Sequence, residues 1–397
     1  MPGLKVLAIF LVTLSPTLLI QHSVEGVKNL YYEEDKDLES RLLILNKKPI
    51  KTFKMEGDTY DCIDVYKQPA FDHPLLQNHK LQMKPTYQPN LWNGRSSSIV
   101  NGSRTALQGV GCSSGTVPIR RTRKEELRSV EQFTNSYIAH VHSTASERTG
   151  QHIATLVPSS ENLAYHGAKA FLAIESLDIK EDQYSTTQMW IESGSHEEYT
   201  SLQAGWMVSP HVGGDSKTRL FVYWEATGSK SGCYNQLCPG FVQVDPSVAP
   251  NLPYYPVSKY GEVPYGWDFL ISQDNVTGNW WLTVDENNHV GYWPKDIVPQ
   301  LEGGASAVAW GGLAGGPPNE DSPPMGNGYF PTGDLTKSGQ VNGIVTIDAS
   351  NKFVMPEESK IQTYVDNPTC YGIESNGLHK QGGLVYLFGG PGGKCGV

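Results

Sequence analysis

The chain has 397 residues, enough for more than one structural unit at about 100–200 residues per domain. Its formal net charge is −10, and its basic residues form no extended cluster that could bind a phosphate backbone. We therefore expect no nucleic acid among its partners. Gly and Pro are abundant, at 41 and 26 residues, while charged residues make up only 18%. This composition is typical of proteins with many short strands separated by turns.

The first 26 residues predict a secretory signal peptide. Lys5 lies in a short polar start, an apolar run follows, and small residues appear at Ser23 and Gly26. A membrane anchor is the alternative. However, Pro16 interrupts the run, which falls short of the roughly 20 apolar residues that span a bilayer. We therefore expect a secreted protein that has no membrane attachment once the signal is removed.

Residues 27–143 predict a smaller mixed domain ahead of a strand-rich region. Leu38, Leu42 and Leu45 recur at helical spacing, and Pro49 follows them. This pattern indicates one amphipathic helix that needs a partner to bury its apolar stripe.

A second helical pattern in this domain follows a group of basic residues. Four basic side chains form that group: Arg120, Arg121, Arg123 and Lys124. Exposed basic runs in secreted precursors can be processing sites. The alternative is a solvated helix start, because Leu127, Val130 and Phe133 continue at helical spacing. The sequence supports both interpretations equally.

Six cysteines, an even number, predict disulfides in a chain that enters an oxidising lumen. Their three sequence groups favour the following pairs: Cys62–Cys112, Cys233–Cys238 and Cys370–Cys395. Spacing alone does not prove this connectivity. Zinc is the alternative, but no CxxC pair and no His pair at ligand spacing supports it, so we expect no metal.

Two sequons predict N-glycosylation in a secreted chain, at Asn101 and Asn275. Asn101 lies in residues 87–109, a stretch rich in Asn, Ser and Gly that predicts an exposed linker. We expect both asparagines on surface loops.

Residues 144–397 predict an all-β domain. Short β-branched or aromatic runs, bounded by Gly, Pro, Asn or Asp, predict eight strands: residues 169–177, 186–193, 204–210, 218–226, 279–285, 289–294, 306–312 and 342–350. Long helical patterns do not alternate with these strands, which argues against a βαβ architecture. We expect an antiparallel β-sandwich of two sheets, preceded by the smaller mixed domain.

Several blocks of the sequence resemble the neprosin family. YDCIDVYKQPAFDHPLLQNHKLQMKP at 60–85 is similar to the family's activation-peptide domain, and GCSSGTVPIRR at 111–121 to the segment that follows it. AGWMVSP, TRLFVYW, GCYNQLCPGFVQ and FGGPGGKC continue in the family's order. The resemblance covers nearly everything after the signal peptide. It implies a plant-type protein of the extracellular space, cell wall or vacuole, made with an inhibitory propeptide domain.

The resemblance also implies a specific chemistry. The family's founding members are acid-active glutamic peptidases that cleave after proline, and two glutamates on the concave face of a β-sandwich serve as base and acid. Here Gln203 occupies the glutamate position of the E-A-G-W motif, and Leu313 follows W-G-G where the second glutamate stands. Neither side chain can move a proton as a carboxyl group does. The sequence thus predicts a non-catalytic homologue that needs no cofactor.

An active carboxyl peptidase that cleaves after proline is the alternative. Glu192 and Glu225 lie on predicted strands and are the candidates to replace the missing pair. A Ser/His/Asp mechanism has weaker support, because no G-x-S-x-G motif exists and His211 and His289 have no evident nucleophile nearby.

Six aromatic side chains are candidates to line a groove on the sandwich: Trp206, Trp280, Trp281, Tyr292, Trp293 and Trp310. Strand aromatics are more often core residues. A groove that kept them could hold an extended, proline-containing peptide, because PPII segments dock on aromatic surfaces. A cell-wall glycan is equally compatible with stacked aromatics. The sequence carries no signal for the oligomeric state.

Overall fold

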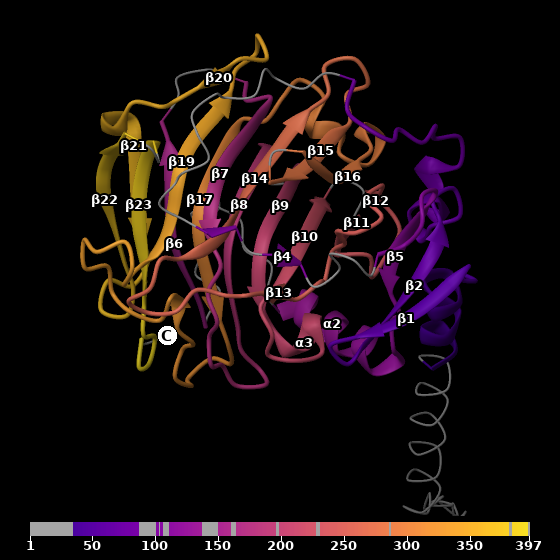
Figure 1. Cartoon of the computed structure of the whole chain (residues 1–397), viewed down its shortest axis with the longest axis horizontal. Helices are drawn as coiled ribbons and strands as arrows, with labels where there is room; N and C mark the ends of the chain where they lie inside the picture. Colours follow the sequence, from indigo (N-terminus) through magenta and orange to yellow (C-terminus); the bar gives the residue numbers. More distant parts are fainter. Residues whose placement is uncertain are drawn as a thin grey trace, which may run out of the picture.

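The computed structural model shows a small mixed domain beside a two-sheet sandwich (Figure 1). The described residues are 35–86, 101–102, 104–105, 111–136, 150–159, 164–195, 198–227, 231–285, 287–380 and 383–395. The predicted signal peptide, residues 1–26, lies outside them. Most of the predicted linker at 87–109 and the predicted domain boundary after residue 143 also lie outside them.

One sheet of the sandwich, here called the seven-stranded sheet, is antiparallel throughout its described strands. Its strand order is β11-β10-β9-β8-β17-β6-β21. The strands have the following bounds: β6 Gln151–Pro158, β8 Tyr184–Gly194, β9 Tyr199–Val208, β10 Arg219–Ala226, β11 Ser231–Tyr234, β17 Ala307–Gly315 and β21 Ile361–Val365. The central strands β9 and β17 are buried on both faces, as expected of strands inside a layered fold.

The other sheet contains eleven of the described strands and has the main order β12-β16-β15-β14-β7-β19-β23-β18. In addition, β20 pairs with β19, β22 pairs with β23, and β3 runs parallel to β14. The strands have the following bounds: β3 Asn101–Gly102, β7 Gly167–Ala173, β12 Val242–Gln243, β14 Tyr265–Gln273, β15 Trp280–Val284, β16 Asn288–Trp293, β18 Met325–Gly326, β19 Gly339–Ile347, β20 Phe353–Val354, β22 Gly372–His379 and β23 Gly383–Gly390.

Alternate side chains of the two sheets meet in a shared core. In β9, Leu202, Ala204 and Trp206 are fully buried, and the Trp206 indole N–H donates to the Ala173 carbonyl of the opposite sheet, 2.6 Å away. Because successive side chains of a strand point to opposite faces, Gln203 points away from this core. We call the side of the seven-stranded sheet that carries it the Gln203 face.

Each of the eight predicted strand segments overlaps a strand of the structure, and the antiparallel β-sandwich is confirmed. In β10, Leu220 and Val222 lie on the core face, whereas Phe221 and Tyr223 lie on the Gln203 face. All four are buried, as their apolar character on both sides of the strand predicts.

The mixed domain contains a three-stranded antiparallel sheet in the order β1-β2-β5. Its elements have the following bounds: β1 Lys51–Met55, β2 Asp58–Asp64, η1 Pro69–Asp72, η2 Pro74–Leu76, β5 Thr116–Arg120 and α2 Lys124–Ser136. The first predicted helix is confirmed over residues 35–45, with Leu38 and Leu45 buried. The second is α2, which buries Leu127 and Phe133.

Shorter elements complete the described chain. They are β4 Arg104–Thr105, α3 Pro210–Gly213, β13 Tyr254–Tyr255, η4 Lys295–Ile297, η5 Pro299–Leu301 and η6 Glu358–Lys360. β4 pairs with β13, and β3 pairs with β14, so part of the predicted linker is attached to the sandwich. Among the described helices, none has the length and apolar character needed to cross a membrane.

The three predicted disulfides are present: Cys62–Cys112, Cys233–Cys238 and Cys370–Cys395. The first lies in the mixed domain and connects β2 to the segment that enters β5. The third connects the segment before β22 to the residues that follow β23. This pairing confirms the grouping expected from the sequence.

The basic group forms ion pairs inside the mixed domain. The Arg120 side chain is 8% exposed and donates to Asp58 and Glu126, at 2.8 Å each. Arg219 of β10 donates to the other Asp58 oxygen at 2.7 Å, which connects this domain to the sandwich. Lys124 begins α2, as the helix-start interpretation expects. Neither interpretation anticipated the buried, paired Arg120.

Candidate functional site

Gln203 and Leu313 lie on the same face of the seven-stranded sheet. Gln203 is opposite Trp190 of β8, and Leu313 of β17 is opposite Thr186 of the same strand. Directly opposed residues of antiparallel strands share a face, and Thr186 and Trp190 are an even number of positions apart. Both family positions are therefore on the Gln203 face, and each side chain is buried, at 4% exposure.

The two positions are not neighbours on that face. They lie two strands apart, about 10 Å, and four residues apart along the strands, about 13 Å. The residue level with Gln203 is Ala309, because Trp190 is opposite both of them. The strand register therefore places positions 203 and 313 on one face but not side by side.

A chain of hydrogen bonds surrounds Gln203. The Gln188 amide donates to Gln203 Oε1 at 2.7 Å, and Gln203 Nε2 donates to Ser201 Oγ at 3.1 Å. The Ser201 hydroxyl in turn donates to Glu192 Oε1 at 3.2 Å. Both ends of the Gln203 amide are thus engaged, and no group at this position can accept a proton from water near neutral or acidic pH.

Glu192 and Glu225 both point to the Gln203 face, as each is directly opposite Ser201. Glu192 is fully buried, and the Tyr223 hydroxyl donates to Glu225 Oε2 at 3.1 Å. Burial raises the pKa of Tyr199 far above its usual range, and the nearby negative charge of Glu192 raises it further. The Gln203 face therefore carries carboxyl groups, but at positions other than 203 and 313.

The six aromatic side chains expected to line a groove are buried in the described structure of the full chain. Four belong to the core cluster between the sheets: Trp206, Trp280, Trp293 and Trp310. Trp281 and Tyr292 pack with Val242 and Ala70 beneath the mixed domain. Alternation along the strands is the cause, since Trp206 is an odd number of positions from Gln203.

Two aromatic residues lie directly opposite Gln203, Trp190 of β8 and Tyr223 of β10, and the sequence analysis did not select Trp190 as a candidate. The Trp190 side chain is fully buried, and its indole N–H has no hydrogen-bond partner among the described residues. Phe133 of α2 packs at one end of the same face, edge-on to Tyr184 and Tyr234. The mixed domain thus covers part of the Gln203 face.

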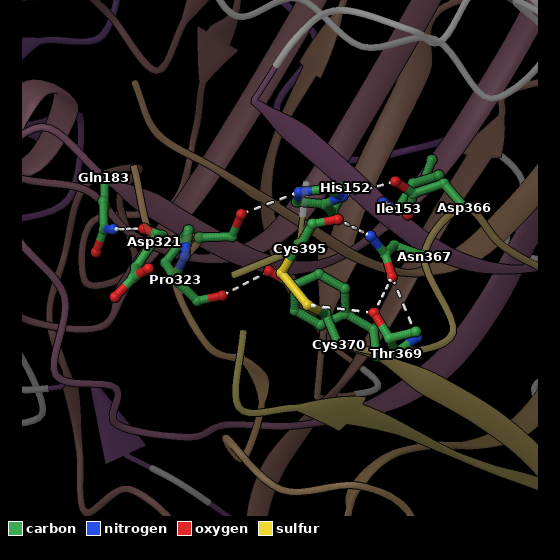
Figure 2. Close-up of a disulfide and its surroundings, with 12 residues drawn as sticks. His152, Ile153, Gln183, Asp321, Pro323, Asp366, Asn367, Thr369, Cys370 and Cys395 are labelled. Atoms are coloured by element: carbon green, nitrogen blue, oxygen red, sulfur yellow. Dashed lines mark hydrogen bonds and ion pairs between the residues drawn. A yellow bond between two sulfur atoms is a disulfide. The ribbon is translucent and has the colours of Figure 1, made fainter. Parts of the chain in front are cut away.

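The histidines also differ from expectation. Ser129 Oγ lies 2.7 Å from His211 Nδ1, and Thr283 Oγ1 lies 3.0 Å from His289 Nδ1, so both histidines have a hydroxyl neighbour. His152, which no motif marked, contacts an aspartate (Figure 2) and also a serine. Among the described residues, no three His, Cys, Asp or Glu side chains gather as metal ligands would.

The two sequons lie in different settings. Asn275 is exposed in the turn between β14 and β15, as glycosylation requires. Asn101 lies in β3, and residue 103 of its sequon is outside the described residues. Glycosylation of both remains a prediction.

The comparisons with known proteins identify the family. The neprosin family matches residues 181–391, more than half of the chain, and the neprosin activation peptide matches residues 50–166. The chain therefore belongs to the neprosin family, which confirms the resemblance seen in its sequence blocks. The activation-peptide match extends beyond residue 143 and includes β6, which the structure places in the seven-stranded sheet.

Two solved structures are also similar. Scytalido-glutamic peptidase with a peptide-based transition-state analog has 10% identity and a TM-score of 0.32, covering 61% of this chain and 98% of that one. SCP-B, a member of the eqolisin family of peptidases in complex with the tripeptide Ala-Ile-His, has 10% identity and a TM-score of 0.31. That match covers 60% of this chain and 97% of the other.

Proposed function

We propose that this chain is a secreted neprosin-family protein that has lost the glutamate-pair chemistry and binds an extended, proline-containing peptide without cleaving it. The supporting observation is the hydrogen-bonded series from Gln188 through Gln203 to Ser201. An acid–base mechanism needs a group that takes a proton from water and one that returns it to the leaving amine. Gln203 does neither, and both Leu313 and Ala309 are apolar.

Peptide binding is supported by the chemistry of the same face. The Gln188 and Gln203 amides and the Trp190 indole N–H are groups that can hydrogen-bond to peptide carbonyls. Because these side chains are buried in the full chain, binding requires the Gln203 face to be uncovered. Acid treatment, the condition under which the family's founding members work, is the natural way to attempt this.

Cleavage assays on purified, acid-treated protein test the proposal. We expect no cleavage of proline-containing peptides by the unmodified protein, together with measurable binding of the same peptides by calorimetry. Binding of glycans but not of peptides would identify the other ligand class named above. Cleavage by the unmodified protein that persisted through stringent purification would overturn the proposal.

Restoration variants sharpen this test. We expect Gln203→Glu with Ala309→Glu to gain peptidase activity, because the strand register places these positions at one level on either side of Trp190. Gln203→Glu with Leu313→Glu is the matched control, since position 313 lies on the same strand and face but farther along. Activity only in the Gln203→Glu, Leu313→Glu variant would show that the second glutamate belongs at position 313, as the sequence motif indicates, and not at position 309.

An active carboxyl peptidase is a second candidate, favoured by one observation: Glu192 and Glu225 flank Ser201 on the Gln203 face. If the unmodified protein cleaves peptides, Glu192→Gln and Glu225→Gln should each abolish cleavage. Cleavage that survived both substitutions would exclude this carboxylate pair.

A further inference from the structure

His152 of β6 lies between a serine and an aspartate that are far from it in sequence. Its Nε2 is 3.0 Å from Ser322 Oγ, and its Nδ1 is 2.7 Å from Asp366 Oδ2. Both distances are within the range of a nucleophile–base and a base–orienter hydrogen bond. We propose that Ser322, His152 and Asp366 form a serine acyl-transfer site at the edge of the seven-stranded sheet, separate from the Gln203 face.

The hydrogen bonds select the tautomer that this chemistry needs. An ionised carboxylate only accepts, so the contact with Asp366 places the imidazole hydrogen on Nδ1. Nε2 then carries the lone pair that accepts the Ser322 hydroxyl hydrogen. The other Asp366 oxygen accepts from the Ile153 backbone N–H at 2.8 Å, and the Asp366 N–H donates to the Ile153 carbonyl at 3.2 Å. The carboxylate is therefore held in place beside the histidine.

The serine is also held from several sides, and Figure 2 shows its two chain neighbours, Asp321 and Pro323. Its backbone exchanges two hydrogen bonds with Gly393, at 2.8 and 2.9 Å. The Tyr371 hydroxyl donates to the carbonyl of Pro323 at 2.7 Å, and Gln183 donates to the carbonyl of Asp321 at 2.7 Å. Both neighbours of Ser322 are thus tied to the sandwich, and preorganisation of this kind is what a reactive side chain requires.

The Cys370–Cys395 disulfide joins the two segments that support this arrangement. Cys370 precedes Tyr371, and Cys395 lies two residues beyond Gly393. The Tyr371 ring also packs against the His152 ring, with centroids 5.3 Å apart. The Ser322 site therefore combines β6, the 320–324 loop and the chain segment after β23.

The Ser129–His211 pair shows what distinguishes the Ser322 site. There the serine hydroxyl contacts Nδ1, and among the described residues no carboxylate hydrogen-bonds to the His211 ring. A serine on Nδ1 without an orienting acid lacks the arrangement that activates a hydroxyl. Ser129 is therefore a matched internal control.

The proposed reaction is acyl transfer from an ester. Ser322 Oγ attacks the ester carbonyl carbon as its proton passes to His152 Nε2, and the resulting tetrahedral adduct expels the alcohol, which takes that proton. Water then attacks the acyl-serine through the same base, releasing the carboxylic acid and restoring Ser322. Asp366 remains ionised and stabilises the imidazolium. The step needs no oxidant, reductant or cofactor.

The residue after the serine sets the substrate class. In the nucleophile elbow of α/β-hydrolases, the backbone N–H after the serine helps to stabilise the oxyanion. Here that residue is Pro323, which has no N–H. With less oxyanion stabilisation, we expect reaction with activated esters, whose leaving groups depart readily, rather than with amides.

Labelling of the full chain with a fluorophosphonate, located by peptide mass spectrometry, tests the site. We expect Ser322 to react at least about 100-fold faster than Ser129. Asp366→Asn should slow Ser322 labelling by at least about 100-fold, because it favours the wrong tautomer. Ser322→Ala should abolish both this labelling and hydrolysis of p-nitrophenyl acetate above background, while Ser129→Ala should leave both unchanged.

His152→Gln should stop labelling while the melting temperature shows that the protein remains folded. If His152→Gln unfolds, Asp366→Asn decides the question, because it preserves the shape of the carboxyl group. Labelling of Ser322 no faster than that of Ser129, or labelling unchanged in folded Asp366→Asn, would show that the three residues are only a structural hydrogen-bond network.

Discussion

The Gln203 face and the Ser322 site both involve strands of the seven-stranded sheet, but they differ in the side chains that surround them. Gln203 lies on central strand β9, where the sequence resembles a family motif, yet its side-chain hydrogen-bond partners are an amide and a hydroxyl. His152 lies on β6 near the sheet edge, where no motif marks it, yet it contacts both a hydroxyl and a carboxylate. The sequence resemblance therefore pointed to positions that carry no carboxyl group, while the tertiary structure brought a serine, a histidine and an aspartate together elsewhere.

The largest expected effect is a fall in the stability of the whole protein at alkaline pH, caused by the buried Glu175. This fall limits the pH range in which the Gln203 face and the Ser322 site can be compared. Burial raises the pKa of Glu175 to about 8 from an ordinary value of 4.5, with a smaller opposing effect from the Ser258 hydroxyl. The folded protein then holds a proton that the unfolded chain releases, so the free energy of unfolding falls as the pH rises from 4.5 to about 8. The loss is at most about 5 kcal/mol.

Glu175→Gln should remove this pH dependence and raise stability at pH 9 while changing little at pH 4. Denaturant unfolding at both pH values measures it. Glu357→Gln, at a surface residue paired with Lys360, is the matched control and should change little at either pH. If the free energy of unfolding of Glu175→Gln depended on pH as that of the unmodified protein does, the Glu175 carboxyl group would not be the cause of the lower stability at alkaline pH.

Removal of the Cys370–Cys395 disulfide should impair the Ser322 site while leaving the Gln203 face functional. The bond closes a loop with a sequence separation of 25, so replacing both cysteines by serine should cost about 3–4 kcal/mol of stability. We expect Ser322 labelling to fall sharply in the variant that remains folded, because Tyr371 and Gly393 lose their connection. Peptide binding at the Gln203 face should persist. Loss of both functions together would indicate global unfolding rather than a local effect.

Gln203→Ala tests the Gln203 face with a smaller effect. The substitution leaves the buried Gln188 amide without its acceptor and should cost about 1–3 kcal/mol, measured by urea unfolding. Peptide binding should weaken, while Ser322 labelling should not change. A variant that binds peptides as the unmodified protein does would remove Gln203 from the binding surface.

Tyr371→Phe should have the smallest effect. It removes one hydrogen bond to the Pro323 carbonyl, which should cost about 1 kcal/mol of stability and slow Ser322 labelling. Tyr364→Phe, at an exposed position of β21, is the matched control and should change neither. Equal labelling rates in the two variants would show that Tyr371 does not position the serine.

Much of the architecture could be predicted from local patterns. Runs of β-branched and aromatic residues between turn formers located the eight strand segments, and helical spacing located α2 and the helix at 35–45. Cysteine grouping predicted the three disulfides. Each of these signals depends on residues close in sequence, or on a small set of cysteines, so sequence reasoning could recover them.

Strand register was beyond such patterns, because it depends on which strands pair and at which offset. The alternation of side chains along each strand could not by itself show that Trp206 lies on the core face while Trp190 lies on the Gln203 face. Nor could it show that Ala309, rather than Leu313, lies level with Gln203. For this reason the sequence could not show which of the six candidate aromatics face the core between the sheets.

The sequence by itself determined the family, the strand-rich architecture and the absence of glutamates at positions 203 and 313. Only the tertiary structure could bring His152, Ser322 and Asp366 within hydrogen-bond distance, because these residues are separated by 170 and 214 positions from the histidine. Contacts over such separations follow from sheet pairing and loop closure around one core. No local spacing rule encodes them.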